Sequence, residues 1–236
     1  MSVGRSVSVA LQGLDGVVVA VEADVGRGLP GMHIGGLGDA AVAEARDRVR
    51  TAAVNSGLTW PRTKVVVSMS PASLRKHGSA FDLAIVCAVL SSGLDDCDEA
   101  RGRLERTALL GEVGLDGTVR PVQGILPAVI AARDAGLRWA VVPTANVAEA
   151  ALVDGIAVGG VSSLAQLWRW ALTGGGVDAP DGAQRDAGTR DAPDMRDIHG
   201  QDAARRSLEV VAAGGHHLFL SGPPGTGKTI PCLGTV

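Results

Sequence analysis

The sequence predicts a mixed α/β fold for most of the chain, on three observations. The 236 residues are 46% hydrophobic, which is enough to build a buried core. Runs of β-branched residues alternate with segments of helical periodicity across residues 1–173. Residues 174–193 then carry almost no large apolar side chain, which is typical of a linker. We therefore expect an N-terminal mixed α/β domain at 1–173, a flexible linker at 174–193 and a second module at 194–236.

The first part of the chain is predicted to be β-structure. Residues 6–11 alternate in polarity, residues 14–16 offer a turn, and residues 17–21 are largely β-branched. Glycines and a proline then break the pattern around a further short strand at residues 32–34. We expect paired strands over residues 1–36.

A helix should follow these strands, since Asp39 can cap its first turn and Gly57 can end it. Its apolar positions keep a spacing of three and four residues, and its other face carries several arginines. Two interpretations of that face stay open. It is either a solvated surface with a Glu44–Arg48 pair or a basic strip that faces a partner.

The remaining elements of the first domain follow from the same periodicities. Strands are expected at residues 64–69, 109–115, 118–122, 139–142 and 156–158, and helices at 79–90, 127–135, 147–153 and from 163 onward. Residues 91–106 are polar and predict a surface connection. The pair Asp116-Gly117 predicts a hairpin in which both residues take positive φ. In the last helix, Trp168 is expected in the core and Trp170 at the surface.

The helix predicted at residues 79–90 is apolar nearly all round, so we expect it inside the domain. Asp82 is the exception in this segment. Its carboxylate either compensates the helix dipole in the first turn or serves as a catalytic acid.

Composition limits the classes of function. A net charge of −3 gives no global attraction to nucleic acid or to an anionic membrane, so a DNA-binding surface would have to be local. Cys87, Cys97 and Cys232 share no metal-ligand or redox spacing, and they suggest no disulfide framework. The start of the chain does not resemble a signal peptide, and no apolar run is long enough for a membrane span. We expect a cytoplasmic protein without a membrane partner.

The most specific motif lies at residues 222–229, which match the phosphate-loop pattern G-x-x-x-x-G-K-[ST] without a break. Backbone N–H groups of such a loop surround phosphate oxygens, its lysine reaches the outer phosphates, and its hydroxyl holds Mg²⁺. The apolar residues 218–220 predict the strand that has to precede the loop. The predicted nucleotide-binding residues are Gly222, Pro223, Pro224, Gly225, Thr226, Gly227, Lys228 and Thr229, with Thr229 as the Mg²⁺ ligand. The adjacent His216 and His217 would point to opposite faces of an extended segment, which argues against joint metal binding.

The segment after the motif is short. Pro231 falls in the second turn of the helix that the loop should open, where proline costs about 3 kcal/mol. So short a helix is marginal in water, and no later strand bearing an acidic residue follows. The expectation is that this chain carries a truncated start of an ATPase module, with no catalytic residue, and does not hydrolyse ATP by itself.

Motifs in both parts of the chain resemble one family. Residues 198–229 resemble the opening of the AAA+ module in magnesium-chelatase-related proteins. Residues 28–31, 46–50 and 76–83 resemble the amino-terminal domain of that family's ComM/YifB-type branch. The resemblance implies ATP and Mg²⁺ as cofactors, and it places Gly200 and Gln201 near the adenine.

The family's amino-terminal domain is similar to the proteolytic domain of Lon, and residues 111–124 resemble Lon's stretch around its catalytic lysine. The resemblance implies a Lon-like fold, and it makes a serine–lysine dyad a hypothesis to test. Alignment puts Ala80 at the position of the nucleophile and Leu126 at that of the lysine, so the hydroxyl and the amine are both missing. Ser79, one residue away, is the nucleophile that an alignment shift would leave.

The resemblance implies an ATP-binding protein whose intact relatives are helicase-like hexameric ring ATPases that act on DNA in recombination and transformation. The expected partners are ATP, further copies of the chain and DNA. Two alternatives remain. One is a non-catalytic adaptor or truncated remnant whose stable part is residues 1–173. The other is an ATPase subunit of magnesium chelatase that serves porphyrin metallation.

Overall fold

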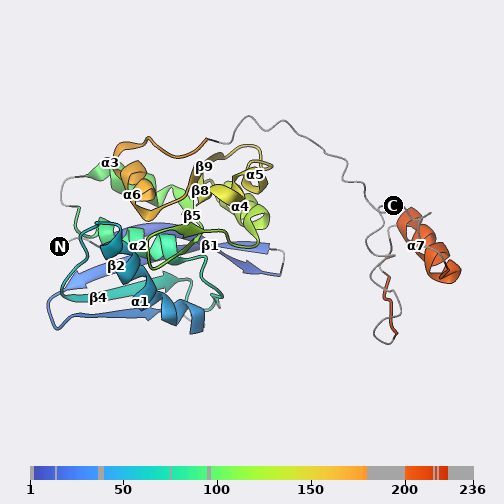
Figure 1. Ribbon diagram of the computed structural model, residues 1–236, viewed down its shortest axis with the longest axis horizontal. Coiled ribbons are helices and arrows are strands. Elements are labelled where there is room, and N and C mark those ends of the chain that lie inside the picture. The colour runs from blue at the N-terminus through green and yellow to red at the C-terminus, as the bar shows by residue number, and fades with distance from the viewer. Residues whose placement is uncertain are drawn as a thin grey trace. The chain divides into compact units, whose positions relative to one another are not determined.

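The computed structural model describes residues 3–13, 15–36, 40–74, 76–94, 97–179, 200–214, 216 and 218–222. The chain divides into two compact units, residues 1–183 and residues 184–236 (Figure 1). None of the helices in the described residues is long and apolar enough to cross a bilayer.

The first unit is built on a seven-stranded sheet in the order β3-β4-β2-β1-β5-β8-β9. Its strands are β1 (Gly4–Gln12), β2 (Asp15–Gly26), β3 (Gly31–Gly35), β4 (Lys64–Ser70), β5 (Thr107–Leu109), β8 (Trp139–Pro143) and β9 (Ala157–Val161). The hairpin of β1 and β2 and the pairing of β2 with β4 are antiparallel, whereas all the other neighbours are parallel. A separate two-stranded ribbon joins β6 (Glu112–Val113) to β7 (Val119–Arg120). The predicted mixed α/β class is confirmed.

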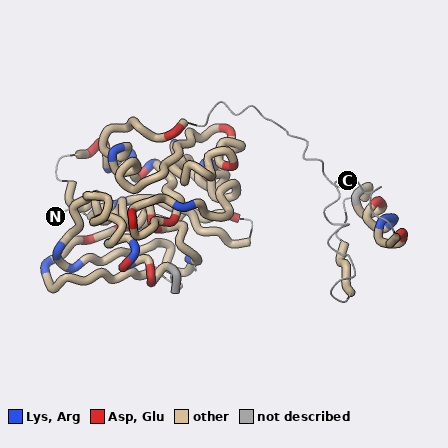
Figure 2. Tube along the Cα trace, in the orientation of Figure 1, with Lys and Arg blue, Asp and Glu red and all other residues tan. Residues whose placement is uncertain are grey.

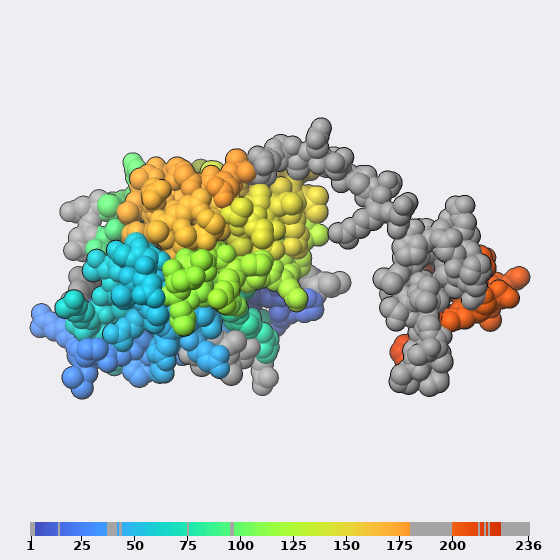
Figure 3. Space-filling model, viewed as in Figure 1, coloured from blue at the N-terminus to red at the C-terminus, as the bar shows by residue number. Residues whose placement is uncertain are grey.

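Helices cover both faces of this sheet, which gives three layers. The helices of the first unit are α1 (Ala40–Asn55), α2 (Asp82–Ser91), α3 (Asp98–Glu105), α4 (Ile125–Asp134), α5 (Val147–Ala150) and α6 (Leu164–Thr173), with a 3-10 turn, η1 (Thr144–Asn146), before α5. The helices α1, α2, α3 and α6 enclose one apolar cluster, and α4 and α5 enclose another on the opposite face. In Figure 3 the segment around β6 and β7 lies beside α1, where Asn55 Nδ2 donates a hydrogen bond to the Leu115 carbonyl at 2.7 Å.

The side chains of β1 alternate between the two faces of the sheet, so this one strand contributes to both apolar clusters. Ala10 packs into the cluster that contains α2, and the neighbouring Val9 packs into the cluster under α4. Successive side chains of a strand point to opposite faces, so a strand covered on both sides must be apolar on both. Ser6 faces α2, where its hydroxyl donates a hydrogen bond to the Ala84 carbonyl at 2.7 Å.

The hairpin between β6 and β7 differs from its prediction. Gly117 takes a φ of +84°, but Asp116 is not among the residues with positive φ. The Gly114 N–H donates to the Thr118 carbonyl at 2.8 Å, and the Gly117 N–H donates to the Gly114 carbonyl at 2.9 Å. This is a three-residue loop with glycine at its left-handed position, a form that needs positive φ only there.

Two further predictions for the first unit were wrong. The helix α3 occupies part of the segment predicted as a surface connection, and its Ala100 and Leu104 are buried. Trp170 is 1% exposed, whereas Trp168 is only partly buried. Tertiary packing decides this, because the ring of Trp170 lies beside that of Trp139, with 6.1 Å between their centroids.

The chain after α6 continues along β9 before it leaves the described residues at 179. Asp178 forms an antiparallel bridge with Gly160, and its carboxylate accepts a hydrogen bond from the Thr144 hydroxyl at 2.8 Å. Asp178 lies in the segment predicted as a linker, of which residues 180–193 fall outside the described part.

Candidate functional site

The second unit carries the predicted nucleotide site. Gly200, Gln201 and Gly222 are described and exposed, whereas residues 223–229, including Lys228 and Thr229, lie outside the described residues. Gly200 and Gln201 take left-handed φ values of +74° and +56° immediately before helix α7 (Asp202–Gly214). The Gln201 carbonyl accepts hydrogen bonds from the N–H groups of Ala204 and Arg205 and so begins the helix.

The strand expected at residues 218–220, after the helix α7, is not present in the described residues. Residues 218–220 have no strand assignment, and Phe219 is 89% exposed. A strand needs a neighbour for its backbone hydrogen bonds. Within residues 200–214, 216 and 218–222 no partner strand occurs, which gives the physical reason for the difference.

The donor set of residues 222–229 fits a triphosphate with Mg²⁺. Glycine backbone N–H groups and the Lys228 ammonium are donors to phosphate oxygens, and the Thr229 hydroxyl is an oxygen ligand of the kind Mg²⁺ prefers. Among the described residues no cluster of His, Cys, Asp and Glu could hold a metal ion. The prediction that His216 and His217 do not bind a metal jointly stays a prediction, because His217 lies outside the described part.

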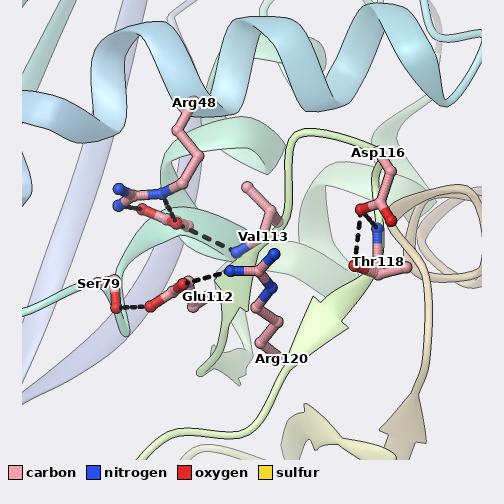
Figure 4. Close-up of polar contacts among 8 residues, drawn as sticks. Arg48, Ser79, Glu112, Val113, Asp116, Thr118 and Arg120 are labelled. Atoms are coloured by element: carbon pink, nitrogen blue, oxygen red, sulfur yellow. Dashed lines mark hydrogen bonds and ion pairs between the residues drawn. The ribbon is translucent and has the colours of Figure 1, made fainter.

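The first unit contains a polar cluster between α1, α2 and the β6–β7 ribbon, formed by Arg48, Ser79, Asp82, Glu112 and Arg120 (Figure 4). Asp82 begins α2 and is 1% exposed. The Arg48 guanidinium donates to both of its oxygens, at 2.7 and 2.9 Å, and the Val113 N–H donates to it at 3.1 Å. The predicted partner of Arg48 on its own helix, Glu44, is therefore replaced by a buried carboxylate.

The electrostatics of this pair reflect burial and close contact. Burial raises the pKa of Asp82, while the hydrogen bonds from Arg48 and from the Val113 N–H oppose that rise. The hydrogen bond to Asp82 raises the pKa of Arg48, which stays charged. The bidentate contact between the Arg48 guanidinium and the Asp82 carboxylate links α1 to α2, and the hydrogen bond from the Val113 N–H adds β6. Asp82 lies in the first turn of α2, as predicted, and its contacts with Arg48 and Val113 add a structural role there.

The other members of the cluster do not form a serine–lysine dyad. The Ser79 hydroxyl donates to a Glu112 carboxylate oxygen, and the second Glu112 oxygen lies 3.5 Å from Arg120. Lys76, three residues before Ser79, is fully buried, and its ammonium donates to the carbonyls of Gly36, Met69 and Pro71. Nothing in the sequence pattern indicated that this lysine points inward.

The positions aligned with the protease dyad carry no reactive side chain. Ala80 lies beside a small pocket of about 110 Å³, and its carbonyl accepts a hydrogen bond from the Gly111 N–H at 3.0 Å. The Leu126 N–H donates to the Glu149 carboxylate at 2.9 Å, which satisfies one backbone donor in the first turn of α4. An acyl transfer at this place would lack both its nucleophile and its base.

These features define a class of protein: a two-unit chain with a layered α/β first unit and a phosphate-loop sequence in the second. Comparison with family models narrows the class. Residues 21–146 match the model described as subunit ChlI of Mg-chelatase, and residues 194–233 match the model described as magnesium chelatase, subunit ChlI.

Individual relatives agree with the family models. An uncharacterized protein of Mycobacterium tuberculosis is 50% identical over 98% of this chain, and YifB of Salmonella typhimurium is 37% identical over 94%. The competence protein ComM of Haemophilus influenzae is 33% identical over 98% of this chain. The chain belongs to the magnesium-chelatase-related family that includes YifB and ComM.

The coverage of these relatives is partial. The chain spans 45%, 43% and 45% of the three proteins, respectively. A weaker similarity to the Lon protease of Mycolicibacterium smegmatis, 29% identity, covers 61% of this chain and 18% of that protein.

Proposed function

We propose that this chain is the ATP-binding part of an AAA+ motor of the ComM type, which assembles from several copies and acts on DNA in the cytoplasm. The observation that carries the proposal is the unbroken phosphate-loop sequence at residues 222–229, within the segment that matches the second family model. The relative named as a competence protein supports the choice of DNA as the target. Because the chain covers less than half of these relatives, the activity and partners of the whole protein are part of the proposal.

In this proposal Lys228 neutralises the outer phosphates, and the backbone of residues 222–227 binds the remaining phosphate oxygens. The Mg²⁺ ion, held through Thr229, supplies charge neutralisation at the phosphates when bound. Gly200 and Gln201, with their left-handed backbone before α7, lie near the adenine. The functional divisions are the N-terminal domain at 1–173, the linker at 174–193 and the nucleotide-binding module from 194.

We infer that the first domain is a Lon-like scaffold without protease chemistry. The similarity to a Lon protease supports the scaffold. The side chains at positions 80 and 126 and the hydrogen bond of Ser79 to Glu112 support the lack of an acyl-enzyme step. A purified chain should therefore leave a casein substrate intact.

Binding of a fluorescent ATP analogue tests the nucleotide site. We expect saturable, Mg²⁺-dependent binding to the purified chain. The Lys228→Ala variant should bind about tenfold more weakly or worse, because a charge-assisted hydrogen bond is worth about 1.5–3 kcal/mol. Lys64→Ala, which removes an exposed lysine of the first unit, is the matched control and should bind as the unmodified chain does. Equal binding by the Lys228 variant would contradict the proposed site.

A chelatase ATPase is the second candidate, because both family models carry that description. The two candidates differ in their target. A chimera with the residues after Thr229 taken from Salmonella YifB should hydrolyse ATP faster with DNA present if the motor proposal holds, whereas porphyrin metallation gives DNA no role.

A further inference from the structure

A pocket of about 250 Å³ lies between α1, β3 and the segment that leads into β4. Arg46 and Arg50 of α1, exposed His33 of β3, and Trp60 are among the residues that line it. Trp60 is 8% exposed, so it belongs to the floor, whereas the two arginines lie at the surface. The pocket thus joins an apolar floor to a cationic rim.

The arginines of α1 lie in two different environments. Arg48 turns inward to Asp82, whereas Arg46 and Arg50 both line the pocket, one helical turn apart. Arg50 makes no hydrogen bond or ion pair with any of the residues that the structure describes. Its guanidinium is available for an anion.

Asp47 is the acidic group in this pocket, and its effect is small. It lies 3.3 Å from Arg46, but the two side chains are 81% and 54% exposed, and such pairs contribute little. Exposed Arg27, Arg62 and Lys64 lie on neighbouring segments, and Figure 2 shows basic positions at the end of the sheet where β2 leads into β3. The neighbouring segments therefore add exposed basic side chains near the two arginines, although the chain as a whole carries a charge of −3.

We propose that this pocket binds single-stranded DNA, with phosphates on Arg46 and Arg50 and one base against Trp60 and the apolar floor. Proteins that hold single strands combine a cationic path for the backbone with aromatic side chains for the bases. The apolar floor favours a nucleotide over an acidic peptide, because a base can pack against an apolar surface and a carboxylate cannot. The choice of DNA as the polymer rests on the proposed function, but the site itself rests on the geometry of the pocket.

Fluorescence anisotropy of a labelled oligothymidylate, measured without ATP over a series of salt concentrations, tests the site. The double variant Arg46→Ala/Arg50→Ala should lose about tenfold in affinity, and the slope of log K against log salt should fall by about 1.4, about 0.7 for each phosphate contact. His33→Ala should leave both the affinity and the slope unchanged, because this side chain points to the other face of β3. Asp47→Asn should strengthen binding.

The control is Arg133→Ala/Arg138→Ala, which makes the same change in charge on α4 and at the residue before β8. An equal loss in this control, or an unchanged slope in the Arg46/Arg50 variant, would overturn the proposal. Polyglutamate that competes as well as unlabelled oligothymidylate would overturn the nucleic-acid assignment. Tryptophan fluorescence during urea denaturation checks that every variant is folded.

The outcome is separable from that of the proposed function. A Lys228→Ala chain should retain the oligothymidylate affinity, and the Arg46/Arg50 variant should retain ATP-analogue binding. Loss of either activity in the wrong variant would identify which of the two sites is misassigned.

Discussion

The first unit buries two apolar clusters against the two faces of one sheet, whereas none of the described residues of the second unit is buried. The phosphate-loop sequence lies in the second unit, whereas the first unit carries alanine and leucine at positions 80 and 126, which the sequence comparison aligned with a serine–lysine dyad. The buried apolar clusters thus lie in the first unit, whereas the sequence motif with a recognisable chemical function lies in the second. A specific sequence motif can therefore lie in a segment whose described residues are not buried.

The largest expected effect that tests this comparison is a cavity in the first unit. Trp170→Ala should lower the free energy of unfolding by about 3–5 kcal/mol, because a fully buried ring leaves a large void. All four tryptophans lie in the first unit, so urea denaturation followed by tryptophan fluorescence measures that unit alone. Leu208→Ala in α7 is the matched control and should shift the transition by less than about 0.5 kcal/mol. An equal shift would show that the two units unfold together.

The Arg48–Asp82 pair should give the next largest effect. Arg48→Ala leaves a buried carboxylate without its cation, which we expect to cost about 3 kcal/mol at neutral pH. Arg46→Ala, on the same helix but exposed, should cost less than about 0.5 kcal/mol. Both values come from urea denaturation.

The pH dependence of the Arg48→Ala variant sharpens this test. Burial already raises the pKa of Asp82, and removal of Arg48 takes away a group that opposes the rise. An acid with a higher pKa in the folded state binds its proton more readily there, so folding is favoured as the pH falls through that pKa. The stability deficit of the variant relative to the unmodified chain should therefore shrink on acidification. A deficit that grows would contradict the assignment of Asp82 as an unpaired buried charge.

The smallest expected difference concerns two glycines with positive φ. A Cβ added to Gly117 would lie 2.1 Å from Ser56 Oγ, whereas one added to Gly200 meets nothing within 4 Å. Gly117→Ala should cost about 2 kcal/mol in the tryptophan transition, from backbone strain and this contact together. Gly200→Ala carries similar local strain but should leave that transition unchanged. Circular dichroism would show whether it reduces the helix content of α7.

The regular elements of the first unit could be predicted from the sequence because their periodicity is strong. The alternation in β4 and the three-and-four spacing in α1 each place one apolar side toward a core. The helix α3 was missed because its eight residues bury only Ala100 and Leu104, too few for a visible stripe.

Side-chain partners were less predictable because they depend on contacts between distant segments. Arg48 and Asp82 are 34 positions apart, and local spacing favours Glu44 for the same arginine. Trp170 is buried by Trp139, which belongs to a strand of another part of the chain. The phosphate loop is the opposite case, since its chemistry follows from a local pattern of backbone and side-chain donors, and its binding of ATP stays a prediction.

Lys76 gives the first unit a chemical reporter of its own opening. Its ammonium is enclosed by carbonyls from the end of β4 and the connections next to β3 and β4, whereas Lys64, at the other end of β4, is exposed. An amine-acylating reagent would modify Lys64 directly in the folded state and Lys76 only during local or global unfolding. The ratio of the two labelling rates would therefore report how often the structure opens around Lys76. The measurement needs no substitution and no attached probe.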